Sequence, residues 1–193
     1  MEGTSAAGVR AAGDQTLRRL VERAQEGDRG AVEQLYLSHS DRVYSFLAMT
    51  VGNRHDAEDL TIQTFVRMME SIDQFTWQSV PFSAWLLRIA RNLAIDHFRA
   101  NRRWHPEEEV PDPPGVEEPS AEEQAMRSVG LTSLQRWMRL LPREQQQVLA
   151  LKILWSFSNA EAAEILEKTE GAVKALQHRA LTSLQRYALP QAA

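Results

Sequence analysis

The amino-acid sequence predicts an all-α protein with two helical domains joined by a flexible acidic linker. Apolar residues recur at helical spacing in both halves of the chain, and the period-two alternation typical of strands is lacking. Between Trp104 and Ala125 lie eight acidic residues and several prolines but no lysine or arginine, a composition that opposes regular structure. We therefore expect a disordered tail over residues 1–13, helical domains over 14–103 and 125–189, and the linker over 104–124.

Four helices are expected in the first domain. A short one ends near Gly27, and its apolar residues are Leu17, Leu20, Val21 and Ala24. A longer one stops near Gly52. The third begins at Asp56, and its acidic first turn suits the positive end of the helix dipole. The fourth begins after Pro81 and reads FSAWLLRIARNLAIDHFRANRR.

The fourth helix is amphipathic, with a cationic side. Its apolar side consists of Leu86, Ile89, Ala90, Leu93, Ala94 and Phe98. Its polar side consists of Arg88, Arg91, Asn92, Arg99, Arg102 and Arg103, with Asp96 at its edge. Such a stripe can follow a phosphate backbone, and an asparagine can read a base edge. Three aromatic residues lie in or near the preceding loop, namely Phe75, Trp77 and Phe82. Their rings are expected either to stack on unpaired bases or to pack in the core.

The second domain is expected to end in a helix-turn-helix. It begins with a helix over 125–141, a break at Pro142 and a helix over 144–154. Ser158 and Glu161 then form a capping-box pattern, and Thr169 caps the last helix. One face of that helix is apolar, with Val173, Leu176, Ala180 and Leu184. The opposite face carries Gly171, Lys174, Ala175, His178, Arg179 and Thr182, and this composition suits a DNA major groove.

The charge balance supports a nucleic-acid partner once the linker is set apart. The net charge of the chain is −4. Without the eight acidic residues of the linker, the rest of the chain has 22 basic and 18 acidic residues and is therefore mildly basic. The chain has no cysteine, which excludes disulfides and thiolate metal sites and fits a cytoplasmic location. No apolar run approaches the roughly 20 residues of a membrane-spanning helix, so we expect no membrane insertion.

Two other classes of function compete with this interpretation. A polymerase-independent helix-turn-helix regulator would explain residues 158–186 but would leave the arginine-rich fourth helix without a role. An enzyme is disfavoured because the sequence contains no metal-spaced histidine pair, glycine-rich phosphate loop or nucleophile motif. We expect no catalytic residue, metal or cofactor.

The chain resembles the bacterial sigma factors of the extracytoplasmic-function (ECF) group over nearly all of residues 14–189. The matching segments, in order, are DAEDLTIQTFVRMMESIDQF, FSAWLLRIARNLAIDHFRANRR and LPREQQQVLALKILWSFSNAEAAEILEKTEGAVKALQHRAL. The resemblance implies sigma domains two and four, no catalytic activity, and binding to the β′ clamp helices and β flap of core RNA polymerase. It implies promoter DNA as a second partner, with domain two reading and melting the −10 element and domain four reading the −35 element. An anti-sigma factor is an expected further partner.

The resemblance also implies which residues make these contacts. Polymerase-binding residues would be Asp59, Gln63, Phe65, Arg67 and Met68, with core burial as the alternative for Phe65. The −10 contacts would be Arg88, Arg91, Asn92 and Asp96, to which the cationic stripe adds Arg99 and Arg103. The −35 contacts would be Thr169, Lys174, Ala175, His178 and Arg179. The chain departs from the family at Glu167, where glycine is frequent, and at Leu181, where arginine is frequent.

Overall fold

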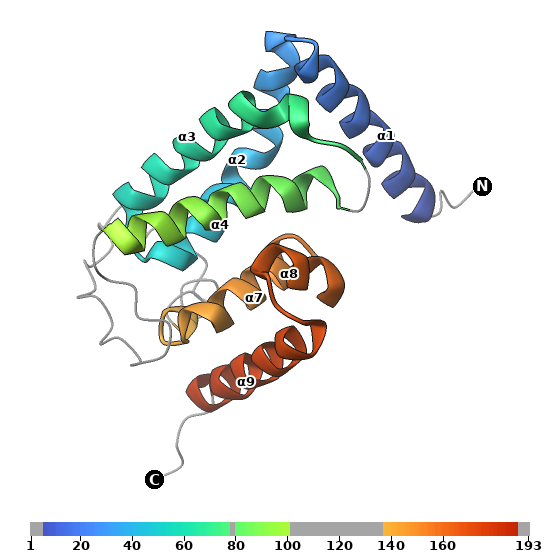
Figure 1. Cartoon of the computed structure of the whole chain (residues 1–193). Coiled ribbons are helices and arrows are strands. Elements are labelled where there is room, and N and C mark those ends of the chain that lie inside the picture. The colour runs from blue at the N-terminus through green and yellow to red at the C-terminus, as the bar shows by residue number, and fades with distance from the viewer. Residues whose placement is uncertain (1–5, 78–79, 101–136, 189–193) are drawn as a thin grey trace, which may run out of the picture.

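Helices account for all the regular structure in residues 6–77, 80–100 and 137–188, the parts of the chain that the computed structural model describes (Figure 1). Side chains are described from residue 14 onward. The first group is α1 (Ala6–Gln25), α2 (Arg29–Val51), α3 (Arg54–Ser71), the 3-10 helix η1 (Ile72–Gln74) and α4 (Phe82–Ala100). The second is α7 (Arg143–Leu154), α8 (Asn159–Leu166) and α9 (Glu170–Ala188). The all-α prediction is confirmed, whereas the predicted linker and residues 125–136 of the following helix lie outside the described residues.

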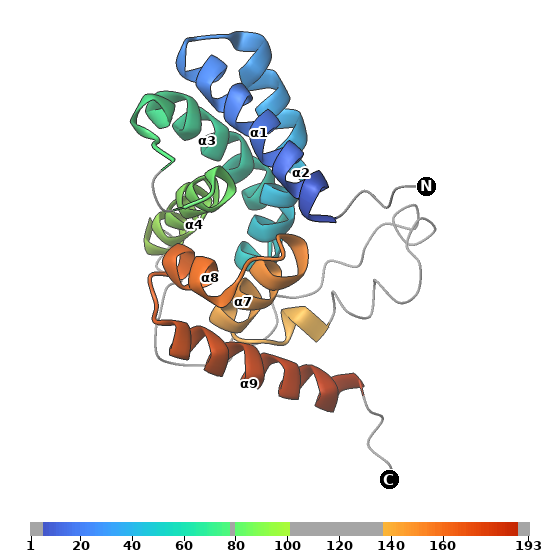
Figure 2. The same cartoon turned by 90° about the vertical axis from the view of Figure 1, so that its right-hand side faces the viewer.

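The helices form layers. In both views α1 to α4 lie on one side, α7 and α8 lie next to them, and α9 lies beyond α7 and α8 (Figures 1 and 2). Helix α2 is central, because it contacts α1, α3, α4 and α7, while α4 contacts α8. The two helical groups therefore pack directly against each other.

Short-range signals in the sequence set the helix boundaries. The Asp28 carboxylate accepts hydrogen bonds from the backbone N–H groups of Gly30 and Ala31 and caps α2. The Arg23 guanidinium, 2.6 Å away, and these capping bonds hold the pKa of Asp28 below its usual value. Helix α2 ends at Gly52, whose φ of 74° is a left-handed conformation that glycine adopts without steric cost. The predicted stop at Gly52 is confirmed.

The expected disordered tail over residues 1–13 is wrong from Ala6 onward, because α1 begins there. The segment AAGVRAAGDQ has several alanines, which have the highest helix propensity, and it continues directly into the apolar repeat of the first helix. The absence of large apolar residues suggested a tail, but alanine needs no packing partner to favour a helix.

One hydrophobic core extends across both groups of helices. It joins Phe46 and Leu86 of the first group to Val148 and Ile165 of the second, all of them completely buried. The sequence did not indicate how the two groups are oriented, and the structure places the second group against α2 and α4. Buried apolar area stabilises this contact at roughly 25 cal/mol per Å².

Within residues 6–77, 80–100 and 137–188, every helix is too short or too polar to cross a membrane.

Candidate nucleic-acid interface

The polar side of α4 forms the first candidate DNA-binding face. Helix α4 buries Phe82, Leu86, Ala90, Ala94 and Phe98 on one side. The opposite side exposes Arg88, Asn92, Asp96 and Arg99, which are spaced three or four residues apart and lie in one row. The predicted exposure of these four side chains is confirmed. Their contact with a −10 strand stays a prediction, and Arg102 and Arg103 lie outside the described residues.

Arg91 differs from the other arginine side chains of this face. Only 14% of its side chain is exposed, and its Nη1 lies 3.2 Å from Oε2 of Glu167 in the turn between α8 and α9. Arg91 is therefore covered in this structure, and its contact with a −10 strand stays a prediction. Arg91 is covered because α8 packs on α4, and this packing brings the acidic side chain of Glu167 to the arginine.

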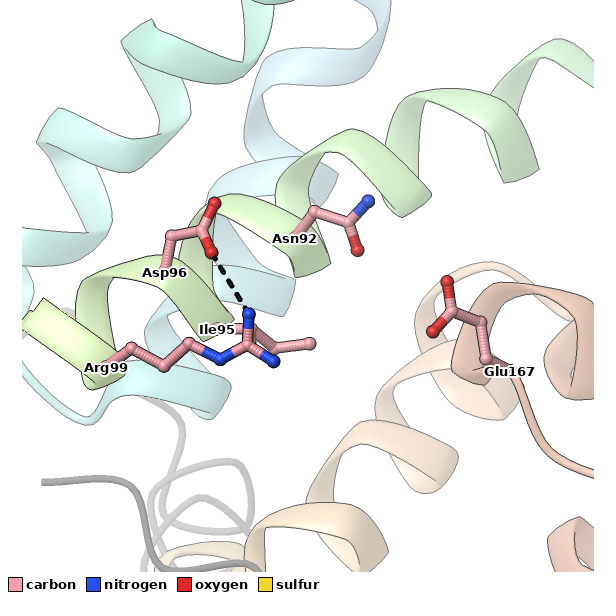
Figure 3. Close-up of a pocket in the computed structure, with 5 residues that line it drawn as sticks. All are labelled: Asn92, Ile95, Asp96, Arg99 and Glu167. Carbon is pink, nitrogen blue, oxygen red and sulfur yellow. Dashed lines mark ion pairs between the residues drawn. The ribbon is translucent and has the colours of Figure 1, made fainter.

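A pocket of about 300 Å³ lies where α4 meets this turn. Asn92, Ile95, Asp96 and Arg99 line it from α4, and Glu167 lines it from the opposite side (Figure 3). The Asp96 and Arg99 side chains form an exposed ion pair at 3.7 Å. The pocket combines two carboxylates, a guanidinium and an amide, so it offers both hydrogen-bond donors and acceptors.

The aromatic residues before α4 belong mainly to the core. Phe75 is 5% exposed and Phe82 is completely buried, so base stacking is wrong for these two rings in this structure and core packing is confirmed. Trp77 is half-buried, meets Phe75 edge-on at 5.0 Å, and has the Arg18 guanidinium 4.8 Å from its centroid. The Gln25 side chain donates to the carbonyl oxygens of Ile72 and Phe75 at 2.8 and 2.9 Å, so α1 holds the start of this segment in place.

The helix-turn-helix is formed by α8 and α9. The backbone N–H of Ser158 donates to the Glu161 carboxylate at 2.7 Å, and the N–H of Glu161 donates to Ser158 Oγ at 3.2 Å. Thr169 Oγ1 accepts from the N–H of Ala172 at 3.2 Å and caps α9. Both predicted caps are confirmed. Glu167 has φ 54° and ψ 44°, so a non-glycine residue adopts the left-handed turn conformation.

Helix α9 presents the second candidate face. Val173, Leu176 and Ala180 are buried against α7 and α8. The opposite side is exposed, as predicted, and carries Thr169, Lys174, Ala175, His178 and Arg179. This face belongs to the outermost helix, on the far side of α7 and α8 from α4 (Figure 2). The structure therefore separates the two candidate DNA-binding faces.

Helix α3 carries the predicted polymerase-binding residues, and the structure divides them into two groups. Asp59, Gln63 and Arg67 are exposed in one row, with Arg67 paired to Glu70 at 2.9 Å. Phe65 and Met68 are 5% and 0% exposed, so neither is available for a partner in this structure. Core burial, the alternative for Phe65, is confirmed, and the assignment of Met68 as a surface contact is wrong in this structure because it also packs into the core.

Three exposed apolar residues of α3 were missed from the sequence. Ile62, Val66 and Met69 are 59%, 41% and 48% exposed and follow the i, i+4, i+7 spacing of a single helical stripe. Contiguous exposed apolar residues mark protein interaction sites. The signal was present as a second apolar stripe beside the buried one, but only packing shows which stripe faces inward.

Among the described residues, no group of three His, Asp or Glu side chains is placed to hold a metal ion.

Comparison with known proteins finds two family models along the chain. Sigma-70 region 2 matches residues 35–104, and Sigma-70, region 4 matches residues 131–184. The ECF RNA polymerase sigma factor SigW of Bacillus subtilis is 30% identical over 179 residues, which cover 88% of this chain and 95% of SigW. The ECF RNA polymerase sigma factor BldN of Streptomyces coelicolor is 42% identical over 169 residues, which cover 86% of this chain and 64% of BldN. This chain thus spans less than two thirds of BldN.

A solved structure shares the fold. The sigma factor RpoE of Bartonella quintana, in complex with the anti-sigma factor NepR, superimposes with a TM-score of 0.63 at 22% identity. The match covers 80% of this chain and 94% of that one. At this identity the likeness concerns the fold alone.

Proposed function

This chain belongs to the ECF group of bacterial RNA polymerase sigma factors, and we propose that it is a transcription initiation factor that directs core RNA polymerase to specific promoters. The observation that carries the proposal is the pair of exposed faces, one on α4 and one on α9. They lie in the segments that match sigma regions 2 and 4. A single DNA-binding face would have suited a polymerase-independent regulator equally well.

In the proposed mechanism, the α4 face reads and holds open the −10 element. Arg88 and Arg99 neutralise phosphates of the non-template strand, and each released counterion favours binding. Asn92 and Asp96 have the hydrogen-bonding groups that distinguish bases, an amide for adenine and a carboxylate for the cytosine amino group. Arg103 is proposed as a further phosphate contact. Phosphate neutralisation and base capture together stabilise the melted strand.

The α9 face reads the −35 duplex in this mechanism. Lys174 and Arg179 are exposed cations that can bind phosphate or the guanine edge, and His178 lies between them in the sequence. Ala175 is small enough to let the helix approach the bases closely. Thr169 is exposed at the start of α9, where backbone N–H groups favour a phosphate.

Core polymerase is the proposed partner of the exposed α3 surface. The polar row Asp59, Gln63 and Arg67 runs along the same helix as the apolar residues Ile62, Val66 and Met69. A mixed surface of this kind suits a protein–protein contact, here with the β′ clamp helices.

The remaining assignments follow from this role. Residues 14–103 form sigma domain two, and residues 125–189 form sigma domain four, which would bind the β flap. The chain would act in the cytoplasm and would have no catalytic activity of its own, since polymerase forms the phosphodiester bonds. Because RpoE, which has a similar fold, forms a complex with an anti-sigma factor, we propose an anti-sigma partner here as well.

Run-off transcription tests the proposal. Core polymerase would transcribe genomic DNA fragments of the source organism with and without the chain, and the 5′ ends of the transcripts would be mapped. We expect new start sites that share two upstream sequence elements and weaken when Arg88 is replaced by alanine. Arg19→Ala, which removes an exposed arginine from α1, is the charge-matched control and should leave the start sites unchanged. The absence of any chain-dependent start site would refute the proposal, and tight binding to a palindromic duplex without polymerase would favour the regulator.

A further inference from the structure

The turn between α8 and α9 lies against the face of α4 that is proposed to bind the −10 strand. Glu167 is in this turn, and its carboxylate is 3.2 Å from the Arg91 guanidinium. The same side chain forms the wall of the pocket opposite Asn92, Asp96 and Arg99 (Figure 3). The helix-turn-helix of the second group therefore covers part of the polar side of α4.

Other contacts hold the second group of helices in this position. Trp155, at the end of α7, is 9% exposed, and its ring centroid lies 6.0 Å from that of His39 in α2. The Arg42 guanidinium lies 5.4 Å from the Trp155 centroid, within the range of a cation–π interaction. On the other side of the interface, Arg143 lies over the Phe98 ring at 3.7 Å. Apolar and cation–π contacts therefore dock the two surfaces, and the Glu167–Arg91 pair lies between surfaces that are already in place.

A carboxylate on a guanidinium occupies the site that a DNA phosphate needs. Both anions bind the planar donor fork of arginine in the same manner, and an arginine side chain that is 14% exposed has little remaining surface for a second anion. The chain carries glutamate here although the backbone is left-handed, a conformation that glycine adopts without cost. The negative charge of Glu167 can therefore compete with a DNA phosphate for Arg91, whereas a glycine at this position could not.

We propose that Glu167 acts as an intramolecular competitor of the −10 strand, so that the docked helix-turn-helix masks the DNA-binding face of α4. The −10 strand reaches Arg91 only after α8 has moved off α4. Because the competent form is a fraction of the population, the apparent affinity for single-stranded DNA is reduced by that fraction. This inference rests on the proposed function, since it takes the α4 face as the site of the −10 strand.

The test compares the binding of a fluorescent oligothymidylate to the full chain and its Glu167→Gln variant by anisotropy. Removal of a partly exposed ion pair should raise the apparent affinity roughly two- to fivefold. Glu164→Gln removes the same charge from an exposed position of α8, three residues before Glu167, and is the matched control, for which we expect a smaller change. In an Arg91→Ala background, Glu167→Gln should have no further effect. Equal gains from Glu167→Gln and Glu164→Gln, or an undiminished gain without Arg91, would overturn the inference.

A second measurement follows the movement directly. The chain contains no cysteine, so Gln34→Cys in α2 and Gln185→Cys in α9 allow specific labelling with a fluorescent donor and acceptor. Oligothymidylate should lower the energy transfer between these labels, and saturation of the chain at constant transfer would overturn the inference. If wild-type chain supports transcription in the run-off assay while these results fail, only the masking is refuted. If run-off transcription fails while these results hold, only the proposed function is refuted.

Discussion

Replacement of Phe65 by alanine should destabilise the protein without directly removing a polymerase contact. The ring is 5% exposed in the core between α2 and α3 and packs edge-on against Tyr36 with a centroid distance of 4.8 Å. Deletion of such a ring leaves a cavity and costs about 3–5 kcal/mol of unfolding free energy. For a chain of 193 residues with one shared core, each kcal/mol lowers the melting temperature by roughly 2–4 °C, so the expected shift is roughly 6–20 °C.

The matched variant is Ile62→Ala, three residues earlier on α3. Ile62 is 59% exposed, so its truncation removes little buried surface and should change the unfolding free energy by less than about 0.5 kcal/mol. Circular dichroism melting gives the stability, and capture of core polymerase on the immobilised chain gives the binding. We expect Phe65→Ala to melt early and Ile62→Ala to melt normally but capture less polymerase. A Phe65→Ala variant that melts like wild type and still loses polymerase would refute the assignment of Phe65 to the core.

Three further predictions concern α9, the capping box and a buried histidine. Lys174→Ala and Arg179→Ala should each cost about 1–3 kcal/mol in the binding of a −35 duplex by the holoenzyme, and a gel-shift titration that shows wild-type affinity would contradict the proposed face. Ser158→Ala should cost about 1 kcal/mol in urea unfolding, because the N–H of Glu161 loses its acceptor; an unchanged midpoint would argue against the capping box. Burial lowers the pKa of His39 from 6.5, and the charge of Arg42 adds to this effect. The unfolded chain therefore binds the proton more readily, so stability is fully present above pH 6.5 and falls as the pH drops towards the lower folded pKa, by about 1.4 kcal/mol for each unit of difference. The urea midpoint of the wild type should fall as the pH drops through this range, and that of His39→Gln should not. An equal pH dependence of the midpoint in the two proteins would refute the contribution of His39.

Local signals in the sequence were sufficient for helix boundaries and for the helix-turn-helix. Ser158, Glu161 and Thr169 make the capping bonds that their spacing predicts, and Gly52 ends α2. These interactions join residues only a few positions apart, so they depend little on the rest of the fold. The exposed side of α9 was predictable for the same reason, since helical spacing places its polar residues together.

Sequence spacing could not tell which of two apolar stripes on α3 faces the core. Phe65 and Met68 lie on one stripe and Ile62, Val66 and Met69 on the other. Both stripes have helical spacing, so the choice depends on which side α2 covers. The size of the side chains does not show which stripe is buried either, because large apolar residues serve both core packing and partner binding.

The sequence by itself determined the helical class, the caps, the family and the amphipathic faces of α4 and α9, because each depends on residue type and short spacing. Only the tertiary structure decided that the second group of helices docks on the first and that Arg91 pairs with Glu167, 76 positions later in the chain. The arginine stripe of α4 looked uniform in sequence, yet one of its members is covered by an acidic turn while its neighbours Arg88 and Asn92 remain exposed. This contact arises because α7 packs on α2 and α8 packs on α4, and no local pattern in the sequence encodes that packing.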